Sequence, residues 1–267
     1  MPRFALFGGL YSNYLALEAA VAIAHDRGAD ALWCLGDLGA FGPHPDRVFP
    51  ILDAHDVRCL RGNYDDSIGH ALDDCQCGYT DPRDNHFAQI SYDYTLANTS
   101  DANRAWLRSL PEHAAIEVDG CRVLLCHGSP RRVNEFVWES TASTAFLARL
   151  CDETAADVIC STHTGLHWGR ELPPSRDRPR QRRHWVNVGV LGRPANDGQT
   201  CVWMTLLDID RGRVQAEFVP VEYDHRRLAR EMRSEGLPEE FVTTVTEGWW
   251  TTCLEVLPSR ERRAGEY

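Results

Sequence analysis

An apolar run that stops abruptly at a Gly-Asp pair is the feature that most constrains what this chain can form. Residues 31–35 are continuously apolar, and Gly36 and Asp37 end the run before a turn rich in Gly and Pro. A short apolar run followed by turn residues is typical of a buried strand in a parallel sheet. In open α/β sheets, ligands bind beyond the carboxyl ends of the strands. Asp37 is therefore a candidate metal ligand, although a lone aspartate in such a loop more often caps a turn or a helix.

The first sixty residues alternate between strand and helix patterns. Strands are predicted at 3–8, 31–35 and 57–60, with helices at 13–27 and 45–54 between them. This alternation is the signature of a parallel α/β sheet. Asp119-Gly120 separates two further apolar runs and predicts a hairpin. The later strands are predicted at 114–118, 121–126, 157–160, 185–190, 201–208 and 213–219.

One domain over residues 1–267 is predicted, because neither an internal repeat nor a linker interrupts the pattern. The polar stretch 73–86 is predicted to be a surface lid or insert, and the basic stretch 173–183 a solvated loop between strands. Residues 222–267 are predicted to be C-terminal helices. They cover 224–235 and 238–256, and the tail from Ser259 is expected to fray.

Charge and cysteine usage exclude several classes of protein. The formal net charge of −11 argues against an extensive nucleic-acid surface. No apolar run reaches the ~20 residues of a membrane helix, and the first apolar residues meet Gly8-Gly9 too soon to form a signal peptide. Most of the ten cysteines lie in apolar runs, which favours a reducing cytoplasm over a disulfide framework. Cys75 and Cys77 lie in a polar loop and are predicted to be unpaired, with a metal or redox role as the alternative.

Three more apolar strands end at polar side chains of the kinds that bind metals. Val57–Leu60 leads to Asn63, Val123–Cys126 leads to His127, and Asp157–Thr162 leads to His163. With Asp37, these residues make a mixed oxygen and nitrogen set that suits Mn, Fe, Zn, Ni or a similar divalent metal. Each residue alone is more commonly an ordinary loop residue. The coincidence of all four at strand ends favours a metal site.

In this order and spacing the sequence resembles the calcineurin-like metallophosphoesterases, over residues 3 to about 220. That family carries the motifs D-x-H, G-D, G-N-H-D/E, H-G and G-H-x-H at strand ends, followed by N-P-G-S-V-G-x-P. The matching segments are Gly36-Asp37, Gly62-Asn63-Tyr64-Asp65, His127-Gly128-Ser129-Pro130, Thr162-His163-Thr164-Gly165 and Val186–Pro194. The bacterial branch of diadenosine-tetraphosphatase-like and related small phosphodiesterases is the most similar. The resemblance implies a four-layer α/β/β/α sandwich with mixed sheets.

The departures from the family pattern all concern one of its two metals. Gly9 stands where the first motif has Asp, Tyr11 where it has His, and Gly165 where the last motif has its second His. The other metal of the family uses the residues that match Asp37, Asn63, His127 and His163. The resemblance therefore implies one intact metal site and a degenerate first site, with two ions as the alternative if other donors replace the missing ones. The candidate replacement donors are Tyr11, His167, His86, Cys75 and Cys77.

The resemblance also implies roles for residues beside these motifs. Tyr64 replaces the family's histidine that protonates or stabilises the leaving group, and a phenol with a reference pKa near ~10 is a weaker acid. Asp65 matches the residue that orients that histidine, so Tyr64 and Asp65 are the catalytic candidates. Arginine binds phosphate through two parallel hydrogen bonds. The candidate substrate-binding residues are Tyr11, Asn13, Arg61, Arg131, His167 and Arg193.

The leading hypothesis is a metal-dependent phosphoesterase that hydrolyses a small phosphomonoester or phosphodiester, such as a nucleotide derivative, with a metal-bound water. One alternative is a degenerate module that binds a metal or a nucleotide without turnover. Another is a different reaction at a single Fe or Mn, with help from Cys75 and Cys77. Trp249 and Trp250 are expected to pack in the core, with subunit pairing in a homo-oligomer as their alternative use.

Overall fold

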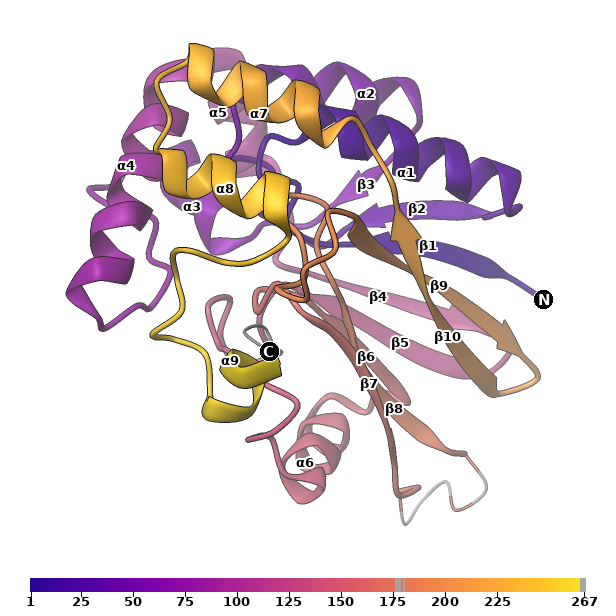
Figure 1. The fold of residues 1–267 in the computed structure, drawn as a ribbon. Coiled ribbons are helices and arrows are strands. Elements are labelled where there is room, and N and C mark those ends of the chain that lie inside the picture. The colour runs from indigo at the N-terminus through magenta and orange to yellow at the C-terminus, as the bar shows by residue number, and fades with distance from the viewer. Residues whose placement is uncertain (176–178, 180, 265–267) are drawn as a thin grey trace.

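The computed structural model describes residues 1–175, 179 and 181–264, and in it two mixed five-stranded sheets pack face to face (Figure 1). The first sheet has the strand order β10-β9-β1-β2-β3 and the second has the order β4-β5-β6-β8-β7. The strands of the first sheet are β1 (Arg3–Phe7), β2 (Ala31–Cys34), β3 (Arg58–Cys59), β9 (Val202–Asp210) and β10 (Arg213–Val221). Those of the second are β4 (His113–Val118), β5 (Cys121–Cys126), β6 (Val158–Ser161), β7 (His167–Leu172) and β8 (Arg183–Val188).

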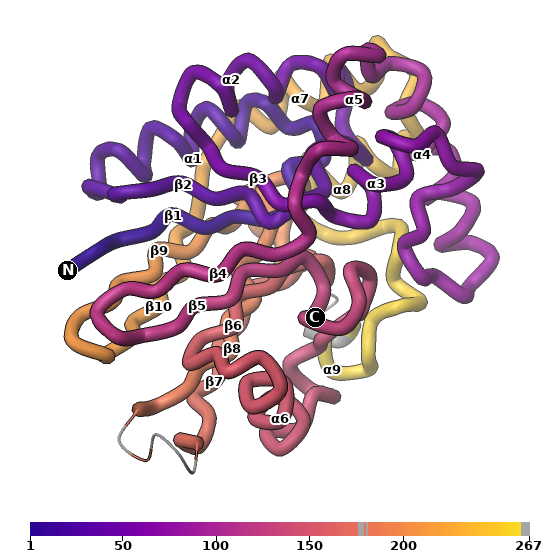
Figure 2. The backbone as a smooth tube through the Cα atoms, turned by 180° about the vertical axis from the view of Figure 1, so that it is seen from behind, coloured from indigo at the N-terminus to yellow at the C-terminus, as the bar shows by residue number. Residues whose placement is uncertain are grey.

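Helices cover the outer face of each sheet, so the molecule has four layers. Most helices lie over the first sheet, and α6 lies against the second (Figures 1 and 2). The helices are α1 (Tyr14–Asp26), α2 (Val48–Ala54) after the 3₁₀ turn η1 (Pro45–Arg47), α3 (Asn63–His70), α4 (Pro82–Asn98), α5 (Asp101–Ser109), α6 (Thr144–Thr154), α7 (His225–Ser234), α8 (Glu239–Glu247) and α9 (Ser259–Ala264). The predicted α/β/β/α fold with mixed sheets is confirmed.

Alternating side chains along each strand build the three apolar interfaces between these layers. In β1, Leu6 packs between the two sheets, whereas Ala5 and Phe7 pack under the helices. In β5, Leu125 packs between the sheets and Cys126 packs toward α6. This alternation follows from the period of two in a strand. Strands buried on both faces therefore read as continuous apolar runs in the sequence.

The parallel strands carry their carboxyl ends to one edge of the sandwich. Strand β2 runs parallel to both β1 and β3, and β6 runs parallel to both β5 and β8. The predicted hairpin at Asp119-Gly120 is confirmed, since β4 and β5 pair antiparallel on either side of it. A parallel bridge between Gly8 and Val190 joins the two sheets at the same edge. Loops that follow strands of different sheets therefore meet there.

The C-terminal region differs from its sequence prediction. The predicted helix 238–256 stops at Glu247, because Gly248 adopts a left-handed conformation with φ 77° that ends a helix. The segment after Gly248 runs past the carboxyl ends of the strands (Figure 1). The first part of the tail predicted to fray instead forms α9, which Glu261 ties to Ser140, and residues 265–267 lie outside the described residues.

Strand β7 was not predicted, because its sequence is polar and contains a glycine. Antiparallel pairing with β8 holds it at the edge of the second sheet. The predicted loop 173–183 includes residues 176–178 and 180, which lie outside the described residues.

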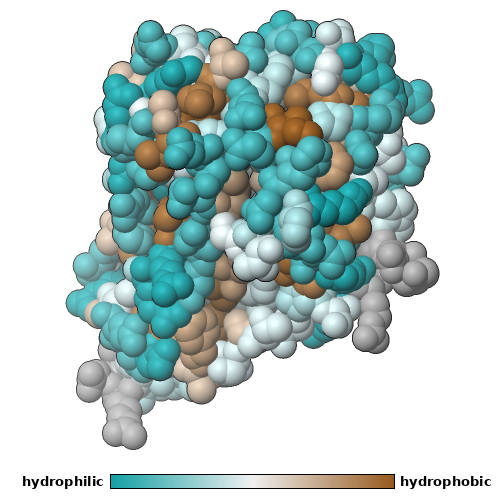
Figure 3. Space-filling model, turned by 90° about the vertical axis from the view of Figure 1, so that its left-hand side faces the viewer, coloured by the Kyte–Doolittle hydropathy of each residue, from teal (hydrophilic) through white to brown (hydrophobic). Residues whose placement is uncertain are grey.

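Among the described residues, no helix is both long and apolar enough to span a bilayer. On the face shown in Figure 3, apolar side chains lie in small groups between hydrophilic ones.

Candidate metal centre

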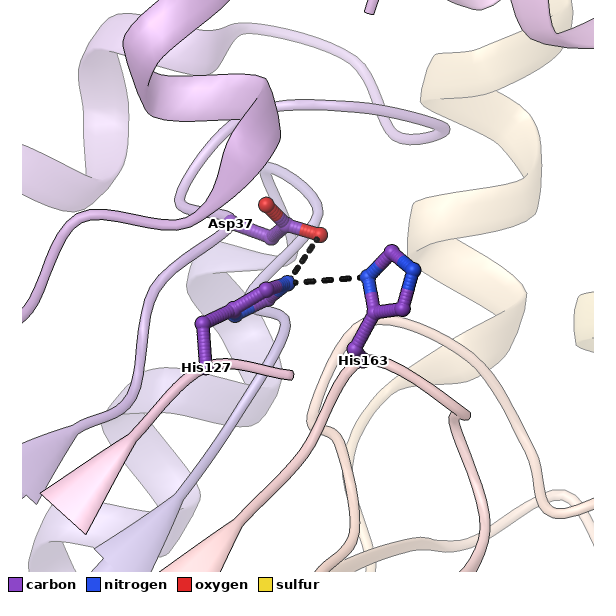
Figure 4. Close-up of side chains that lie close together, drawn as sticks. All are labelled: Asp37, His127 and His163. Atoms are coloured by element: carbon purple, nitrogen blue, oxygen red, sulfur yellow. Dashed lines mark hydrogen bonds and ion pairs between the residues drawn. The ribbon is translucent and has the colours of Figure 1, made fainter. Parts of the chain in front are cut away.

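Three side chains from both sheets converge at the strand ends. Asp37 follows β2, while His127 and His163 follow β5 and β6 (Figure 4). The Nε2 atom of His127 lies 3.2 Å from Oδ2 of Asp37 and 3.1 Å from Nδ1 of His163. Atoms that bind one ion at roughly 2.0–2.2 Å lie roughly 3–3.5 Å apart. The three side chains are buried, and each offers a ligand atom within 4.8 Å of the others, so together they could hold a divalent metal.

A backbone carbonyl fixes the orientation of His127. Its Nδ1 atom lies 2.7 Å from the carbonyl oxygen of Leu35, the last apolar residue before the Gly36-Asp37 turn. A carbonyl oxygen can only accept, so in the neutral ring Nδ1 carries the hydrogen. The lone pair of Nε2 then faces Asp37 and His163. Such a hydrogen bond to the second nitrogen is the usual way in which proteins orient a metal-binding histidine.

Asn63 begins α3 beside this cluster and has an oxygen without a partner. Its Nδ2 donates to the carbonyl oxygen of Cys75 at 2.8 Å, which fixes the side chain. Its Oδ1 is buried and has no hydrogen-bond partner among the described residues. Both neighbours touch Asp37, since Tyr64 N donates to Asp37 Oδ1 at 3.1 Å and a Cβ on Gly62 would collide with that carboxylate. A buried acceptor without a donor is costly, and a metal would satisfy it. The residues present therefore fit a divalent ion.

Asp65 ties the Asp37 turn to α3. Its carboxylate accepts from the backbone N–H groups of Asp37 at 2.7 Å, Gly62 at 2.8 Å and Leu38 at 2.9 Å. Burial, followed by the nearby negative charge of Asp37, raises the pKa of Asp65 to about 7, although the three N–H groups oppose this rise. The side chain thus holds two ligand-bearing segments together, and it faces backbone rather than the cavity.

The charges of the cluster depend on one another. Burial favours the protonated form of Asp37, but the adjacent His127 outweighs it and the pKa of Asp37 is lowered. Burial favours neutral His127, yet Asp37 outweighs it and the pKa of His127 is raised. Burial and the neighbouring His127 lower the pKa of His163 to about 3. Without a metal, a proton is therefore held more readily by His127 than by His163.

A small cavity of about 60 Å³ adjoins the cluster. Asp37 and His163 form part of its wall, and the phenol rings of Tyr11 and Tyr64 form another part, together with the guanidinium of Arg193. Tyr64 OH lies 2.8 Å from Ser91 Oγ. Burial raises the pKa of both phenols, so they stay neutral and can donate hydrogen bonds. The cavity therefore combines ligand atoms, neutral donors and one cation.

Four other candidate residues point elsewhere and are not among those that line this cavity. Asn13 caps α1 by accepting from Ala16 N and donates to the carbonyl oxygen of Leu191. Arg61 pairs with Glu112, and Arg131 pairs with Glu135. His167 stacks on Trp203 with ring centroids 4.0 Å apart, and burial lowers its pKa. A role for these residues in substrate binding stays a prediction.

Cys75 and Cys77 form a disulfide, which corrects the prediction that they are unpaired. The loop brings their Cα atoms to 5.3 Å, within the range that a disulfide requires. The bridge lies against the candidate ligands, because Asn63 Nδ2 contacts both Cys75 O and, at 3.4 Å, Cys77 Sγ. As bonded sulfurs, neither offers a thiolate to a second metal. His86 is exposed on α4.

Several residues that enclose the cavity were missed by sequence reasoning. Tyr79 and Cys253 line it, and Phe136 packs on His163 with ring centroids 4.3 Å apart. Trp250 covers Arg193 at 3.5 Å from the ring centroid to Cζ. These residues come from irregular segments after β5, before α4 and after α8, where no periodic pattern marks them. Aromatic residues within polar loops were the one available signal.

A model of the calcineurin-like phosphoesterase superfamily domain matches residues 4–212 of this sequence. The chain therefore belongs to the calcineurin-like phosphoesterase superfamily, as the ordered strand-end motifs predicted.

The sequence identity to three individual proteins of similar sequence or structure lies between 18% and 24%. A protein of Methanocaldococcus jannaschii described as uncharacterized protein MJ0912 is 23% identical over 254 residues, which cover 88% of this chain and 93% of the relative. A crystal structure of a metallophosphoesterase from Sphaerobacter thermophilus has a TM-score of 0.68 at 24% identity, and the match covers 92% of this chain and 99% of that one. Hypothetical protein PH1004 from Pyrococcus horikoshii OT3 has a TM-score of 0.72 at 18% identity, covering 94% and 100%. These two structures share the fold of this chain.

Proposed function

We propose that this protein is a divalent-metal-dependent phosphoesterase whose ion is held by Asp37, Asn63, His127 and His163. The observation that carries this proposal is the convergence of buried Asp37, His127 and His163 ligand atoms in a member of this superfamily. When bound, a divalent ion supplies Lewis acidity and activates water at neutral pH. Mn, Fe, Zn and Ni all accept a mixed oxygen and nitrogen set.

The chain's own residues would orient the substrate and its leaving group. The neutral phenol of Tyr64 lines the cavity with Ser91 and can donate a hydrogen bond to a phosphoryl or leaving oxygen. Tyr11 offers a second phenol in the lining of the same cavity. Asp65 is a positioning residue in this proposal, because its carboxylate accepts hydrogen bonds from the backbone of Asp37 and Gly62 and does not face the cavity.

We further propose a single-ion site, in a cytoplasmic enzyme of the diadenosine-tetraphosphatase-like and small-phosphodiesterase branch. Gly9 and Gly165 have no side chain to offer a second ion, and Tyr11 presents a phenol whose raised pKa keeps it protonated. The departures from the family motifs support this proposal, and the ordered strand-end motifs support the branch. The substrate would be a small phosphorylated compound.

The test combines metal analysis with hydrolysis of a small panel of substrates. The purified chain is expected to bind about one Mn²⁺ per molecule and to hydrolyse nitrophenyl phosphomonoesters or phosphodiesters once Mn²⁺ is added. Chelation should abolish turnover and fresh metal should restore it. His163→Ala should remove both metal and turnover. Tight metal binding without turnover on any phosphoester would sink the hydrolase proposal.

A second candidate function is binding without turnover, and the small volume of the cavity favours it. At about 60 Å³ the cavity is well below the roughly 300–1,000 Å³ of most ligand pockets. A chain of this kind would bind the metal and a small anion but release no product. Metal and phosphate binding without hydrolysis of any panel compound would identify it.

A further inference from the structure

Arg193 is a buried cation that has no carboxylate partner among the described residues, although the side chains of Cys253, Tyr11 and Tyr79 lie near enough to raise its pKa. Its residue is only 7% exposed, and its Nε has no hydrogen-bond partner. No described carboxylate forms an ion pair with it, and the Cys253 thiol is its hydrogen-bonding neighbour. An unpaired buried charge costs several kcal/mol unless something compensates it. An anion bound in the adjoining cavity would compensate this charge.

Arg3 shows how the same guanidinium edge is used when a carboxylate is present. Its Nε and Nη2 donate to the two oxygens of Asp208 at 2.7 and 2.8 Å. This side-on fork binds two oxygens of one planar or tetrahedral anion. In Arg193 the Nε of that edge is unpartnered, and Nη2 lies 3.4 Å from where a Cβ on Gly165 would stand. The fork is thus beside the His163 turn.

Aromatic rings hold the guanidinium in this position. Its Cζ lies 3.5 Å from the centroid of the Trp250 ring and 6.0 Å from that of Tyr11. The indole itself is fixed, since Nε1 donates to the carbonyl oxygen of Pro194 and the backbone N–H donates to Asn196 Oδ1. Stacking on Trp fixes the plane of an arginine and leaves its edge free for hydrogen bonds.

We propose that Arg193 binds two terminal oxygens of the substrate's phosphoryl group while a third terminal oxygen faces the metal ligands. Three terminal oxygens occur on a phosphomonoester, whereas a phosphodiester has two. The structure thus favours phosphomonoesters as the substrate class. Arg193 has this role only if the pocket takes a phosphoester, so the assignment rests on the proposed function.

The test measures binding rather than turnover. Chain loaded with Mn²⁺ is titrated calorimetrically at pH 8 with inorganic phosphate, and separately with dimethyl phosphate, which has two terminal oxygens. Wild type should bind phosphate at least about tenfold more tightly, the contribution of one charge-assisted hydrogen bond. Arg193→Gln should weaken phosphate binding roughly 10- to 100-fold and erase the preference. Mn²⁺ binding should not change.

Arg170→Lys is the matched control. Arg170 also lies over an indole, 5.4 Å from the Trp168 centroid, and donates to the carbonyl oxygens of Ala142 and Glu139, but it does not line the cavity. Its variant should bind phosphate as wild type does. Arg193→Lys keeps the charge but loses the fork, so it should keep weak phosphate binding without the preference. If Arg193→Gln does not fold, the phosphate and dimethyl phosphate affinities of Arg193→Lys test the proposal instead.

Thermal unfolding separates an anion-binding role from a structural one. Arg193 has no carboxylate partner, so its removal leaves no buried carboxylate unpaired. Metal-free Arg193→Gln should therefore melt no lower than wild type and should lose the stabilisation by phosphate. A lower melting temperature with unchanged phosphate affinity would overturn the proposal. So would a wild type that binds phosphate no better than dimethyl phosphate. Phosphate binding through Arg193 without any hydrolysis would instead defeat only the hydrolase function.

Discussion

The two sides of the cavity are built in different ways. On the metal side, Asp37, His127 and His163 come from the turns that follow strands. Backbone hydrogen bonds orient Asp37 and His127, and His163 contacts the His127 ring. On the arginine side, Arg193 lies in a loop and is held by Trp250, more than fifty residues later in the chain. One side is a product of sheet topology, and the other is a product of packing between irregular segments.

This difference predicts where each side tolerates change. The metal side is fixed by hydrogen bonds to main-chain groups, so a single substitution there should cause a large loss of metal affinity. The arginine side is fixed by stacking and by a segment held largely through side chains, since Trp250 N–H donates to Asn196 Oδ1 at 2.8 Å and Val256 N–H donates to Asp84 Oδ2 at 3.1 Å. Substitutions there should lower the affinity for the anion in small steps and leave the affinity for the metal unchanged.

The largest expected effect comes from His127→Ala. The variant loses the central ligand, so bound Mn²⁺ should fall from about one per chain to near zero. Hydrolysis should then fall roughly 10³-fold or more, as when an essential group of an active site is removed. Metal analysis and initial rates on the same sample measure both effects.

His184→Ala is the control for this variant, because His184 lies on β8 of the same sheet and does not line the cavity. This variant should bind as much Mn²⁺ as wild type and hydrolyse substrate at the same rate. A His127→Ala chain that retained one tightly bound ion would show that the metal side is not where we place it.

Two buried aspartates test whether the two sides can be uncoupled. Asp65→Asn replaces a carboxylate that accepts three backbone N–H groups by an amide with a single acceptor oxygen. Loss of such an outer contact typically costs about 10- to 100-fold in metal affinity. Asp84→Asn loosens the segment after α8 and should leave Mn²⁺ affinity unchanged while weakening phosphate binding a few-fold. Equal effects of both variants on Mn²⁺ binding would contradict the comparison.

The pH dependence of binding should also differ between the sides. The adjacent Asp37 outweighs burial and raises the pKa of His127, so the ring keeps its proton to a higher pH and a metal must displace it. Mn²⁺ affinity should therefore rise about tenfold per pH unit below that raised pKa and level off above it. Arg193, whose pKa is also raised, stays charged throughout. Calorimetric titrations between pH 6 and 9 would show this, and a flat profile for Mn²⁺ would count against His127 as a ligand.

The same contrast explains how far the sequence could predict the molecule. Strand patterns are local, so the apolar runs before Asp37, His127 and His163 predicted the strands and the placement of these side chains at their ends. The two-sheet sandwich was predicted from the family resemblance. Arg193 was one of several arginines beside motifs, and no local pattern distinguished it from Arg61 or Arg131. The position of Trp250 could not follow from its neighbours, which read as helix, because Gly248 ends α8 and the tertiary packing decides the rest.

The smallest expected effect compares two glycines with similar backbone conformations. Gly165 has φ 79° and Gly120 has φ 72°. A Cβ at Gly120 would meet nothing within 4 Å, whereas one at Gly165 would lie 3.1 Å from Trp250 and 3.4 Å from Arg193 Nη2. Gly120→Ala should therefore cost only the backbone strain, about 1 kcal/mol of unfolding free energy. Gly165→Ala should cost roughly 1 kcal/mol more, because the stacked pair must shift. Urea unfolding of both variants measures the difference. If the two glycines respond equally, Trp250 does not confine Arg193 against the His163 turn.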